Sequence, residues 1–325
     1  MKTLIYGAGP IGQWLALRLN TAGKDVTLLA RSNYEQLDRD GIVIKDGLTG
    51  EQLTARVKLQ RRLDPEDRFD LVVVVMHRNA RIAVCPILAA NPHLKSVLFL
   101  GNDVEGLPRY FNHLPKNKVL LGFPGVGGGW QGTDLVIMDR EDPSAEFGEI
   151  YLGELDGVRR QRTWLIERLF RSAGIKVNYE NDMDGWLKYH FAFMAPTAGA
   201  ILEKGGDLQA VADDPEAIHR YCRACREAGT VLRKAGYRRR QPAIFNLYYW
   251  LPRWLEPKVF GKLFGSTSAE IRFGLHARTV GRELLVLAEE FKLMASLAGM
   301  RTPTLDQLIE SVRRSGTDVD EKKVA

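Results

Sequence analysis

Three glycines near the start of the chain have the spacing of a dinucleotide-binding turn. They follow the apolar run of residues 1–6 and precede an amphipathic stretch. In such a turn the first glycine permits a tight bend, the second leaves room for a pyrophosphate, and the third lets a helix pack against the strand. The N-terminus of that helix attracts negative charge. The motif predicts a cofactor site made of Gly7, Ala8, Gly9, Pro10, Ile11 and Gly12.

An arginine after the second predicted strand indicates which dinucleotide binds. The strand covers residues 26–29, and Arg31 follows it. Sites for NAD usually have a carboxylate here, which binds the 2′-hydroxyl of the ribose. A guanidinium instead binds a 2′-phosphate with two hydrogen bonds. We therefore expect NADP(H), while a solvated strand-end arginine is the alternative. Arg78, after the apolar run 71–76, is a second candidate for the phosphate, with the same alternative.

The elements that must position these residues alternate between strand and helix. Apolar strands are expected at 4–6, 26–29, 71–75, 96–100 and 119–121, and helices at 13–22 and 80–90. This pattern predicts an α/β fold, in which a Rossmann domain has helices on both faces of a parallel sheet. A β-rich excursion is expected at 41–59, a loop at the glycine-rich 123–129, strands at 135–138, 149–152 and 175–179, and a helix at 163–173.

The pattern becomes helical near residue 180. Helices are expected at 184–193, 215–235, 268–298 and 304–314, with a polar tail at 316–325. We therefore expect two domains. Residues 1–180 would bind NADP, and the all-helical residues 181–325 would bind the substrate and form the contact of a homodimer, if one exists.

Composition narrows the class of protein. The chain has 325 residues, 45% of them hydrophobic, and a net charge of +6. It has no run of 18 apolar residues, so no membrane span is expected. The first strand starts the chain, so we expect no secretory signal and a cytoplasmic protein. A basic cluster at 233–240 has no recognisable nucleic-acid module beside it, so a nucleic-acid partner is not expected.

Two of the three cysteines form a C-x-x-C pair, Cys222 and Cys225. Their neighbours have the pattern of a charged helix, and no second pair completes a zinc site. Two thiols on adjacent helical turns are the better interpretation, and no metal is expected.

The order of chemical residues along the chain resembles the 2-dehydropantoate 2-reductase (ketopantoate reductase) family. Asn102 follows the strand at 96–100, Lys188 opens the first helix of the second domain, and a Ser-x-x-x-x-Ile-Arg segment begins at Ser266. With the glycine motif and Arg31, this resemblance spans nearly the whole chain. It implies an oxidoreductase that reduces the carbonyl of a small 2-oxo acid with NADPH.

The resemblance also implies roles for individual residues. Lys188 would act on the substrate carbonyl as it becomes an alkoxide, and Asn102 would help to hold substrate and nicotinamide. Ser266 would contact the substrate. The chemistry agrees, because hydride delivery builds negative charge on oxygen, and an ammonium stabilises that charge and supplies a proton.

The substrate half of the chain departs from the family pattern. The family has Asn four and eight residues after the lysine, where this chain has Ala192 and Pro196. The family also has Glu twelve residues after the serine, where this chain has Arg278, with His276 nearby. We expect His276 and Arg278 to bind a substrate anion. Ketopantoate reduction itself and a non-catalytic NADP(H) sensor are the two alternatives.

An aromatic segment at 241–255 follows the basic cluster. It is either a helix on a membrane surface or a helix packed within the protein, over the substrate site or against a second subunit. The packed alternative is preferred, because Pro252 interrupts a long amphipathic face.

Ketopantoate should be a poor substrate. Ala192 and Pro196 provide no side-chain hydrogen bond for a hydroxylated 2-oxo acid, and each lost bond costs about 1–3 kcal/mol. Catalytic efficiency with ketopantoate should therefore fall about 10²-fold or more below that with apolar 2-oxo acids, measured as NADPH oxidation. Ketopantoate as the best substrate of the panel, at about 10⁴ M⁻¹s⁻¹ or above, would contradict this prediction.

Overall fold

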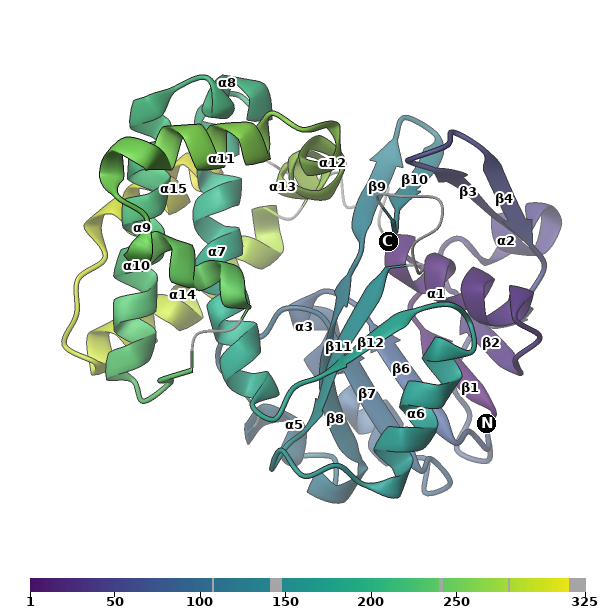
Figure 1. Ribbon diagram of the computed structural model, residues 1–325. Helices are drawn as coiled ribbons and strands as arrows, with labels where there is room; N and C mark the ends of the chain where they lie inside the picture. Colours follow the sequence, from purple (N-terminus) through teal and green to yellow (C-terminus); the bar gives the residue numbers. More distant parts are fainter. Residues whose placement is uncertain (107, 141–147, 240–241, 280, 316–325) are drawn as a thin grey trace. The chain divides into compact units, whose positions relative to one another are not determined.

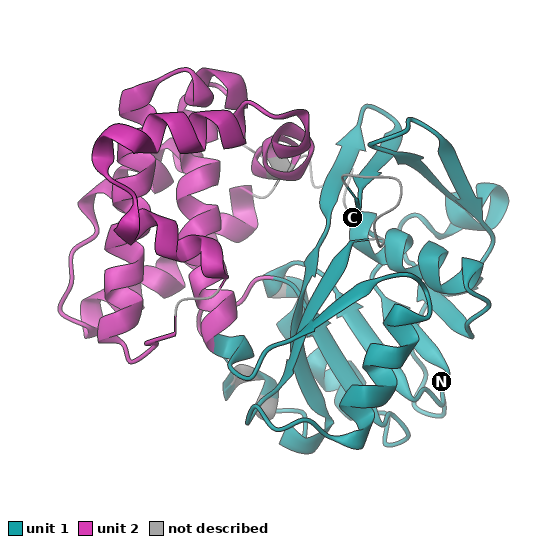
Figure 2. Cartoon of the chain, in the orientation of Figure 1, with its two compact units in different colours: residues 1–101, 106–184, 324–325 teal, residues 102–105, 185–323 magenta. Residues whose placement is uncertain are grey.

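The computed structural model describes residues 1–106, 108–140, 148–239, 242–279 and 281–315. The predicted polar tail at 316–325 lies outside the described residues. The chain divides into two compact units, coloured separately in Figure 2. The first unit contains residues 1–101 and 106–184, and the second contains residues 102–105 and the described residues from 185 onward.

The first unit is built on an eight-stranded sheet, as the predicted α/β class requires (Figure 1). Its order is β12-β11-β8-β7-β6-β1-β2-β5, and all neighbours are parallel except β8 and β11. The central strands are largely apolar and buried because helices cover a parallel sheet on both faces. The strands are β1 (Thr3–Tyr6), β2 (Val26–Leu29), β5 (Lys58–Gln60), β6 (Leu71–Val75), β7 (Ser96–Leu100), β8 (Val119–Gly125), β11 (Glu149–Glu154) and β12 (Lys176–Tyr179).

The helices of the first unit follow the expected order with one difference. They are α1 (Pro10–Thr21), α2 (Tyr34–Asp40), α3 (Arg78–Ala83), α4 (Cys85–Ala89), α5 (Pro108–Phe111), the 3₁₀ turn η1 (Lys116–Lys118) and α6 (Gln161–Arg171). The single helix predicted at 80–90 is wrong, because α3 and α4 meet at Val84. Pro86 explains the break, since it has no N–H to bond the carbonyl one turn earlier.

A second, four-stranded sheet has the order β4-β3-β10-β9. Its strands are β3 (Ile42–Asp46), β4 (Gln52–Ala55), β9 (Gly127–Gln131) and β10 (Asp134–Met138). The loop predicted at 123–129 is wrong, because this segment ends β8 and begins β9. Its glycines serve close strand pairing. A Cβ at Gly128, where φ is 148°, would lie 2.3 Å from the Val136 carbonyl oxygen.

The second unit is helical throughout its described residues. Its elements are α7 (Met183–Glu203), α8 (Leu208–Ala212), α9 (Pro215–Lys234), η2 (Ala243–Asn246), α10 (Leu247–Trp250), η3 (Arg253–Leu255), α11 (Glu256–Phe264), α12 (Thr267–Ala269), the π-helical η4 (Glu270–Gly274), α13 (Leu275–Thr279), α14 (Gly281–Leu297) and α15 (Pro303–Arg314). The helix predicted at 184–193 continues to Glu203, and the one predicted at 268–298 is interrupted at the π-helical turn. No helix in the described part of the chain has the length and apolarity that crossing a membrane requires.

The aromatic segment is not one continuous helix. It folds as η2, α10 and η3, and Pro252 is the N-cap of η3. Phe245 and Tyr248 are buried in the helical core. Trp250 and Trp254 are 74% and 70% exposed. The packed interpretation therefore describes the first two aromatic residues, while the two tryptophans lie on the surface of the chain.

A buried carboxylate fastens α1 to the second sheet. Asp139, directly after β10, accepts hydrogen bonds through Oδ2 from Trp14 Nε1 at 2.7 Å and from Arg18 Nη2 at 2.7 Å. Trp14 and Arg18 are four residues apart and share a helix face. Since all three side chains are buried, the loss of the carboxylate would break a buried ion pair.

Replacing Asp139 with alanine should therefore destabilise the protein by about 3–5 kcal/mol, the usual result of breaking a buried ion pair. Urea denaturation followed by circular dichroism measures the change. The control is Asp40→Ala, which breaks the exposed pair with Arg39 and should leave the midpoint nearly unchanged. Equal midpoints for the two variants would show that Asp139 does not fasten α1.

Candidate functional site

The glycine turn between β1 and α1 is packed so tightly that two of its positions exclude a side chain. Gly7 has φ of 120°, and a Cβ there would lie 2.3 Å from the Val75 carbonyl oxygen of β6. A Cβ at Gly12 would lie 1.8 Å from the Gly7 carbonyl oxygen. Both glycines are therefore required by the backbone itself, as expected for a tight strand–turn–helix connection.

Gly9 has a different reason to be glycine. A Cβ at this exposed position would have no atom within 4 Å, so the protein itself does not require a small residue here. Gly9 is the N-cap of α1, whose first turn has no acidic residue and starts with Pro10. The open space therefore lies at an uncompensated helix N-terminus. This arrangement fits a pyrophosphate that approaches the backbone.

Two amides that the sequence pattern did not single out hold this turn. Gln13 Nε2 and Asn33 Nδ2 each donate a hydrogen bond of 2.9 Å to the Ala8 carbonyl oxygen. Gln13 lies in the first turn of α1 and is 3% exposed, and Asn33 precedes α2. They tie the glycine turn to the segment that leaves β2. In the sequence, Gln13 is a polar residue within an apolar helical stretch, and this pattern could have pointed to it. No comparable sequence pattern pointed to Asn33.

The other predicted cofactor residues follow neighbouring strands of the same parallel sheet. Arg31 is exposed after β2, and Arg78 is 1% exposed at the start of α3, after β6. Burial raises the pKa of Tyr6, at the end of β1, and the positive charge of Arg31 opposes that rise. Arg31 therefore lies within electrostatic reach of the carboxyl end of β1. In open α/β sheets this is the edge where ligands bind.

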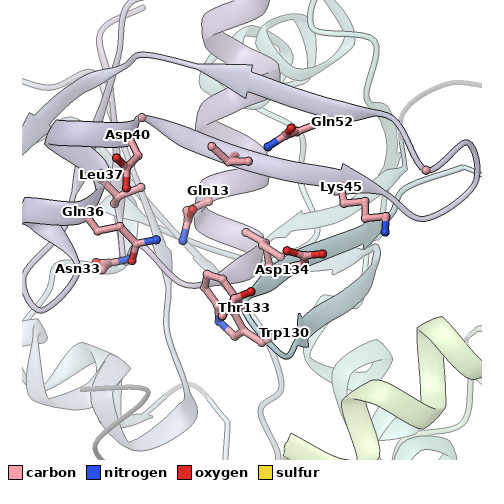
Figure 3. Close-up of a pocket in the computed structure, with 14 residues that line it drawn as sticks. Gln13, Asn33, Gln36, Leu37, Asp40, Lys45, Gln52, Trp130, Thr133 and Asp134 are labelled. Carbon is pink, nitrogen blue, oxygen red and sulfur yellow. The ribbon is translucent and has the colours of Figure 1, made fainter.

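A cavity of about 490 Å³ lies in the first unit beside the glycine turn (Figure 3). It shares Gln13 and Asn33 with that turn but contains none of the predicted site residues. Lys45, Asp40 and Asp134 give it charges of both signs. Its wall comes from α2 and the second sheet and is completed by Gln36, Leu37, Gly41, Val43, Gly50, Gln52, Trp130, Thr133 and Leu135.

Lys188 is a buried cation in the second unit. It lies on α7, is 2% exposed, and its Nζ lies 5.0 Å from the centre of the Tyr237 ring. Tyr189 Oη donates a hydrogen bond of 2.8 Å to the Tyr237 carbonyl oxygen, which holds the segment carrying that ring. His190 stacks on Trp186 with ring centres 5.2 Å apart. The burial expected from the apolar neighbours of Lys188 is confirmed.

Asn102 belongs to the same unit as Lys188, although it directly follows a strand of the sheet. It is 4% exposed. Val104 joins the core cluster of the helical unit, and the backbone N–H of Glu105 donates a 3.0 Å hydrogen bond to Glu290. The sequence predicted the turn but gave no sign that it packs with the helices.

The predicted substrate residues already have intramolecular partners where their side chains are described. The Ser266 hydroxyl accepts the Ala269 N–H at 3.1 Å as an N-cap and donates to the Leu263 carbonyl oxygen at 2.9 Å. Arg278 donates to the Gly206 carbonyl oxygen at 2.7 Å and forms an ion pair with Glu270. The side chain of His276, on α13, lies outside the described residues.

The two positions where the family has asparagine are apolar and buried. Ala192 is 0% exposed, and α7 continues through Pro196. Thr197, the next residue, donates its hydroxyl hydrogen to the Phe193 carbonyl oxygen at 2.8 Å. Neither position offers a side-chain donor or acceptor to a ligand.

Cys222 and Cys225 are free and fully buried on α9. Burial raises the pKa of both thiols, so both remain protonated near neutral pH. Within the described residues, no group of three His, Cys, Asp or Glu side chains is placed to hold a metal ion. The pair behaves as core packing on adjacent helical turns.

Comparison with known proteins identifies relatives of both units. Residues 3–157 match the model of the family described as ketopantoate reductase PanE/ApbA. The chain is 26% identical over 225 residues to a 2-dehydropantoate 2-reductase of Mesorhizobium japonicum, covering 58% of this chain and 63% of that protein. It is 27% identical over 244 residues to the uncharacterised oxidoreductase YkpB of Bacillus subtilis, covering 73% of this chain and 76% of that protein.

A solved structure shares the fold over the full length of the chain. The ternary structure of a D-mandelate dehydrogenase with NADH and anilino(oxo)acetate has a TM-score of 0.74 and 16% identity, and the match covers 100% of both chains. The two proteins therefore share a fold.

Gly9→Ala and Gly12→Ala should separate binding from folding. Gly9→Ala should keep the melting temperature of the parent protein but weaken NADPH binding about 10-fold or more, because a methyl group enters the open space at the helix N-terminus. Gly12→Ala should instead destabilise the fold by about 1–3 kcal/mol or more through backbone overlap. Thermal denaturation and fluorescence titration give the two quantities. Unchanged NADPH affinity in Gly9→Ala would show that the pyrophosphate does not bind at this turn.

Proposed function

Since this chain is a divergent member of the ketopantoate reductase family, we propose that it reduces the carbonyl group of an anionic 2-oxo acid with NADPH. The family consists of oxidoreductases, and the proposal concerns the substrate and the cofactor. The observation that carries it is the buried ammonium of Lys188 on α7. A lysine is almost never fully buried unless it has a partner or a function.

The choice of NADPH over NADH rests on Arg31. The exposed guanidinium after β2 occupies the place where a carboxylate would select the unphosphorylated ribose. The structurally similar D-mandelate dehydrogenase binds NADH, so the fold alone is compatible with either cofactor. The proposal is therefore that Arg31 decides the preference. Arg78 remains a proposed second contact to the cofactor.

The reaction needs a cation at the substrate oxygen. The nicotinamide supplies a hydride to the carbonyl carbon when the cofactor is bound. Lys188 donates a hydrogen bond to the carbonyl oxygen, stabilises the alkoxide as charge builds, and transfers a proton to give the hydroxy acid. The 2% exposure of Lys188 strengthens this interaction, because charges attract more strongly where water is excluded. Asn102 is proposed to hold the substrate and the nicotinamide.

Aromatic side chains keep the ammonium in place. The ring of Tyr237, 5.0 Å from Lys188 Nζ, attracts the cation through its face. The bond from Tyr189 Oη to the Tyr237 carbonyl oxygen fixes that backbone. Tyr189 and Tyr237 are therefore proposed as positioning residues for Lys188.

The substrate is proposed to have an apolar side chain. Ala192 and Pro196 are buried and offer no hydrogen bond to a hydroxyl group. The ligand in the D-mandelate dehydrogenase structure, anilino(oxo)acetate, is an aromatic oxo acid, which supports the same class. Arg278 is proposed to bind the carboxylate, which would replace Glu270 as its ionic partner.

Lys188→Met should keep NADPH affinity within about twofold and lose turnover by about 10²–10⁴-fold, the usual contribution of a proton-transfer residue. Methionine preserves the volume of the buried stem. Lys262→Met, an exposed lysine of the same unit, is the matched control and should turn over normally. Steady-state rates with an aromatic 2-oxo acid measure the effect. Normal turnover in Lys188→Met would place the proton donor elsewhere, and tight NADPH binding without reduction of any 2-oxo acid would favour a sensor.

A further inference from the structure

A second arginine follows the strand beside β2. Strands β2 and β5 are parallel neighbours, with Leu29 opposite Gln60, and the Ala30 N–H donates to the Gln60 carbonyl oxygen at 2.9 Å. Arg61 directly follows the end of β5, whereas Arg31 lies two residues beyond the end of β2, after Ala30. Neighbouring strands lie about 4.8 Å apart. The pairing therefore brings two guanidinium groups, 30 positions apart in sequence, to one end of two adjacent strands.

Arg61 is held toward the segment that leaves β2. Its guanidinium carbon lies 3.8 Å from the centre of the Tyr34 ring, and Nη2 forms an ion pair with Glu35. Tyr34 and Glu35 open α2, and the Tyr34 N–H donates to the Arg31 carbonyl oxygen at 3.4 Å. The turn after β2 thus bends back from Arg31 to the ring on which Arg61 lies.

This arrangement leaves Arg61 able to bind an anion. A guanidinium has five N–H donors in a planar fork, and the ion pair with Glu35 uses Nη2. The other donors lie at the edge of a group whose face is stacked on an aromatic ring. The side chain is 54% exposed, so a ligand can reach it.

Two guanidinium groups, rather than an excess of positive charge, would favour a phosphate over a neutral hydroxyl group. Arg31 and Arg61 carry two positive charges, while Glu35 and Asp38, which both act electrostatically on Arg61, carry two negative charges. Arg62, the next residue along, is already paired with Asp64 at 2.9 Å and points to a separate partner. A phosphate monoester carries about two negative charges and accepts bonds from two guanidinium groups at once.

We propose that Arg61 is a further guanidinium that binds the 2′-phosphate of the cofactor, together with Arg31. The assignment rests on the proposed use of NADP(H). Tyr34 and Glu35 act as positioning residues, because they orient the Arg61 side chain toward the end of β2. The preference for NADP(H) over NAD(H) then depends on arginines that follow two neighbouring strands, and not on Arg31 alone.

The test compares two adenosine ligands that differ only by the 2′-phosphate. Isothermal titration of the full chain with 2′,5′-ADP and with 5′-ADP isolates the contribution of that group. Arg61→Gln should weaken 2′,5′-ADP about 10-fold and leave 5′-ADP unchanged, the effect of losing one charge-assisted bond. Arg62→Gln is the matched control, with the same change of charge one residue away, and should bind both ligands within about twofold of the parent protein.

The outcomes separate this proposal from the proposed function. A parent protein that binds 2′,5′-ADP more tightly than 5′-ADP, with the preference reduced by Arg31→Gln and by Arg61→Gln, supports both. A preference that Arg31→Gln abolishes and Arg61→Gln leaves intact overturns the role of Arg61 and keeps NADP(H). Equal losses in Arg61→Gln and Arg62→Gln would reveal only a general effect of charge and also overturn it. Equal binding of the two ligands by the parent protein contradicts NADP(H) preference itself.

Discussion

The tight contact between the glycine turn and the end of β6 is the constraint on which the first unit depends. Gly7 and Gly12 each place their backbone where a Cβ would overlap a carbonyl oxygen, at 2.3 Å and 1.8 Å respectively. Because α1 starts inside this contact, the direction of its N-terminus is set by backbone packing. At Gly9, between these two positions, a Cβ would meet no atom within 4 Å.

The same turn connects the two sheets of the first unit. Its Ala8 carbonyl oxygen is held by amides from α1 and from the segment after β2. Further along α1, Trp14 and Arg18 reach the buried Asp139 after β10. Side chains of α1 therefore form hydrogen bonds both to the glycine turn and to the residue that follows β10. A shift of α1 would disturb the glycine turn and the second sheet together, which makes the candidate cofactor site a rigid part of the core.

The helical unit buries a lysine side chain in its interior. Lys188 is buried among the side chains of α7 and lies over the face of Tyr237. Burial of a charge is costly unless other groups compensate for it. Nearby positions on the same helix, Ala192 and Pro196, add no hydrogen bond. The buried lysine therefore shares its helix with two positions that lack a polar side chain.

The sequence by itself determined the features that depend on local pattern, and tertiary structure decided those that depend on partners. The strand–turn–helix start, the helical second half and the burial of Lys188 follow from spacing and from apolar neighbours, so they could be predicted. The strand at 123–125 could not, because its glycine and proline pair only in the presence of β11. Sequence likewise placed Arg31 after a strand, but only the pairing of β2 with β5 shows that Arg61 follows the neighbouring strand at the same end of the sheet. The sequence identified Arg278 as a positive charge. It could not identify Glu270 as its ionic partner, because that pairing depends on the π-helical turn between α12 and α13. Pairing across a sheet or a turn joins residues whose spacing carries no periodic signal, and for that reason it appears only in the folded chain.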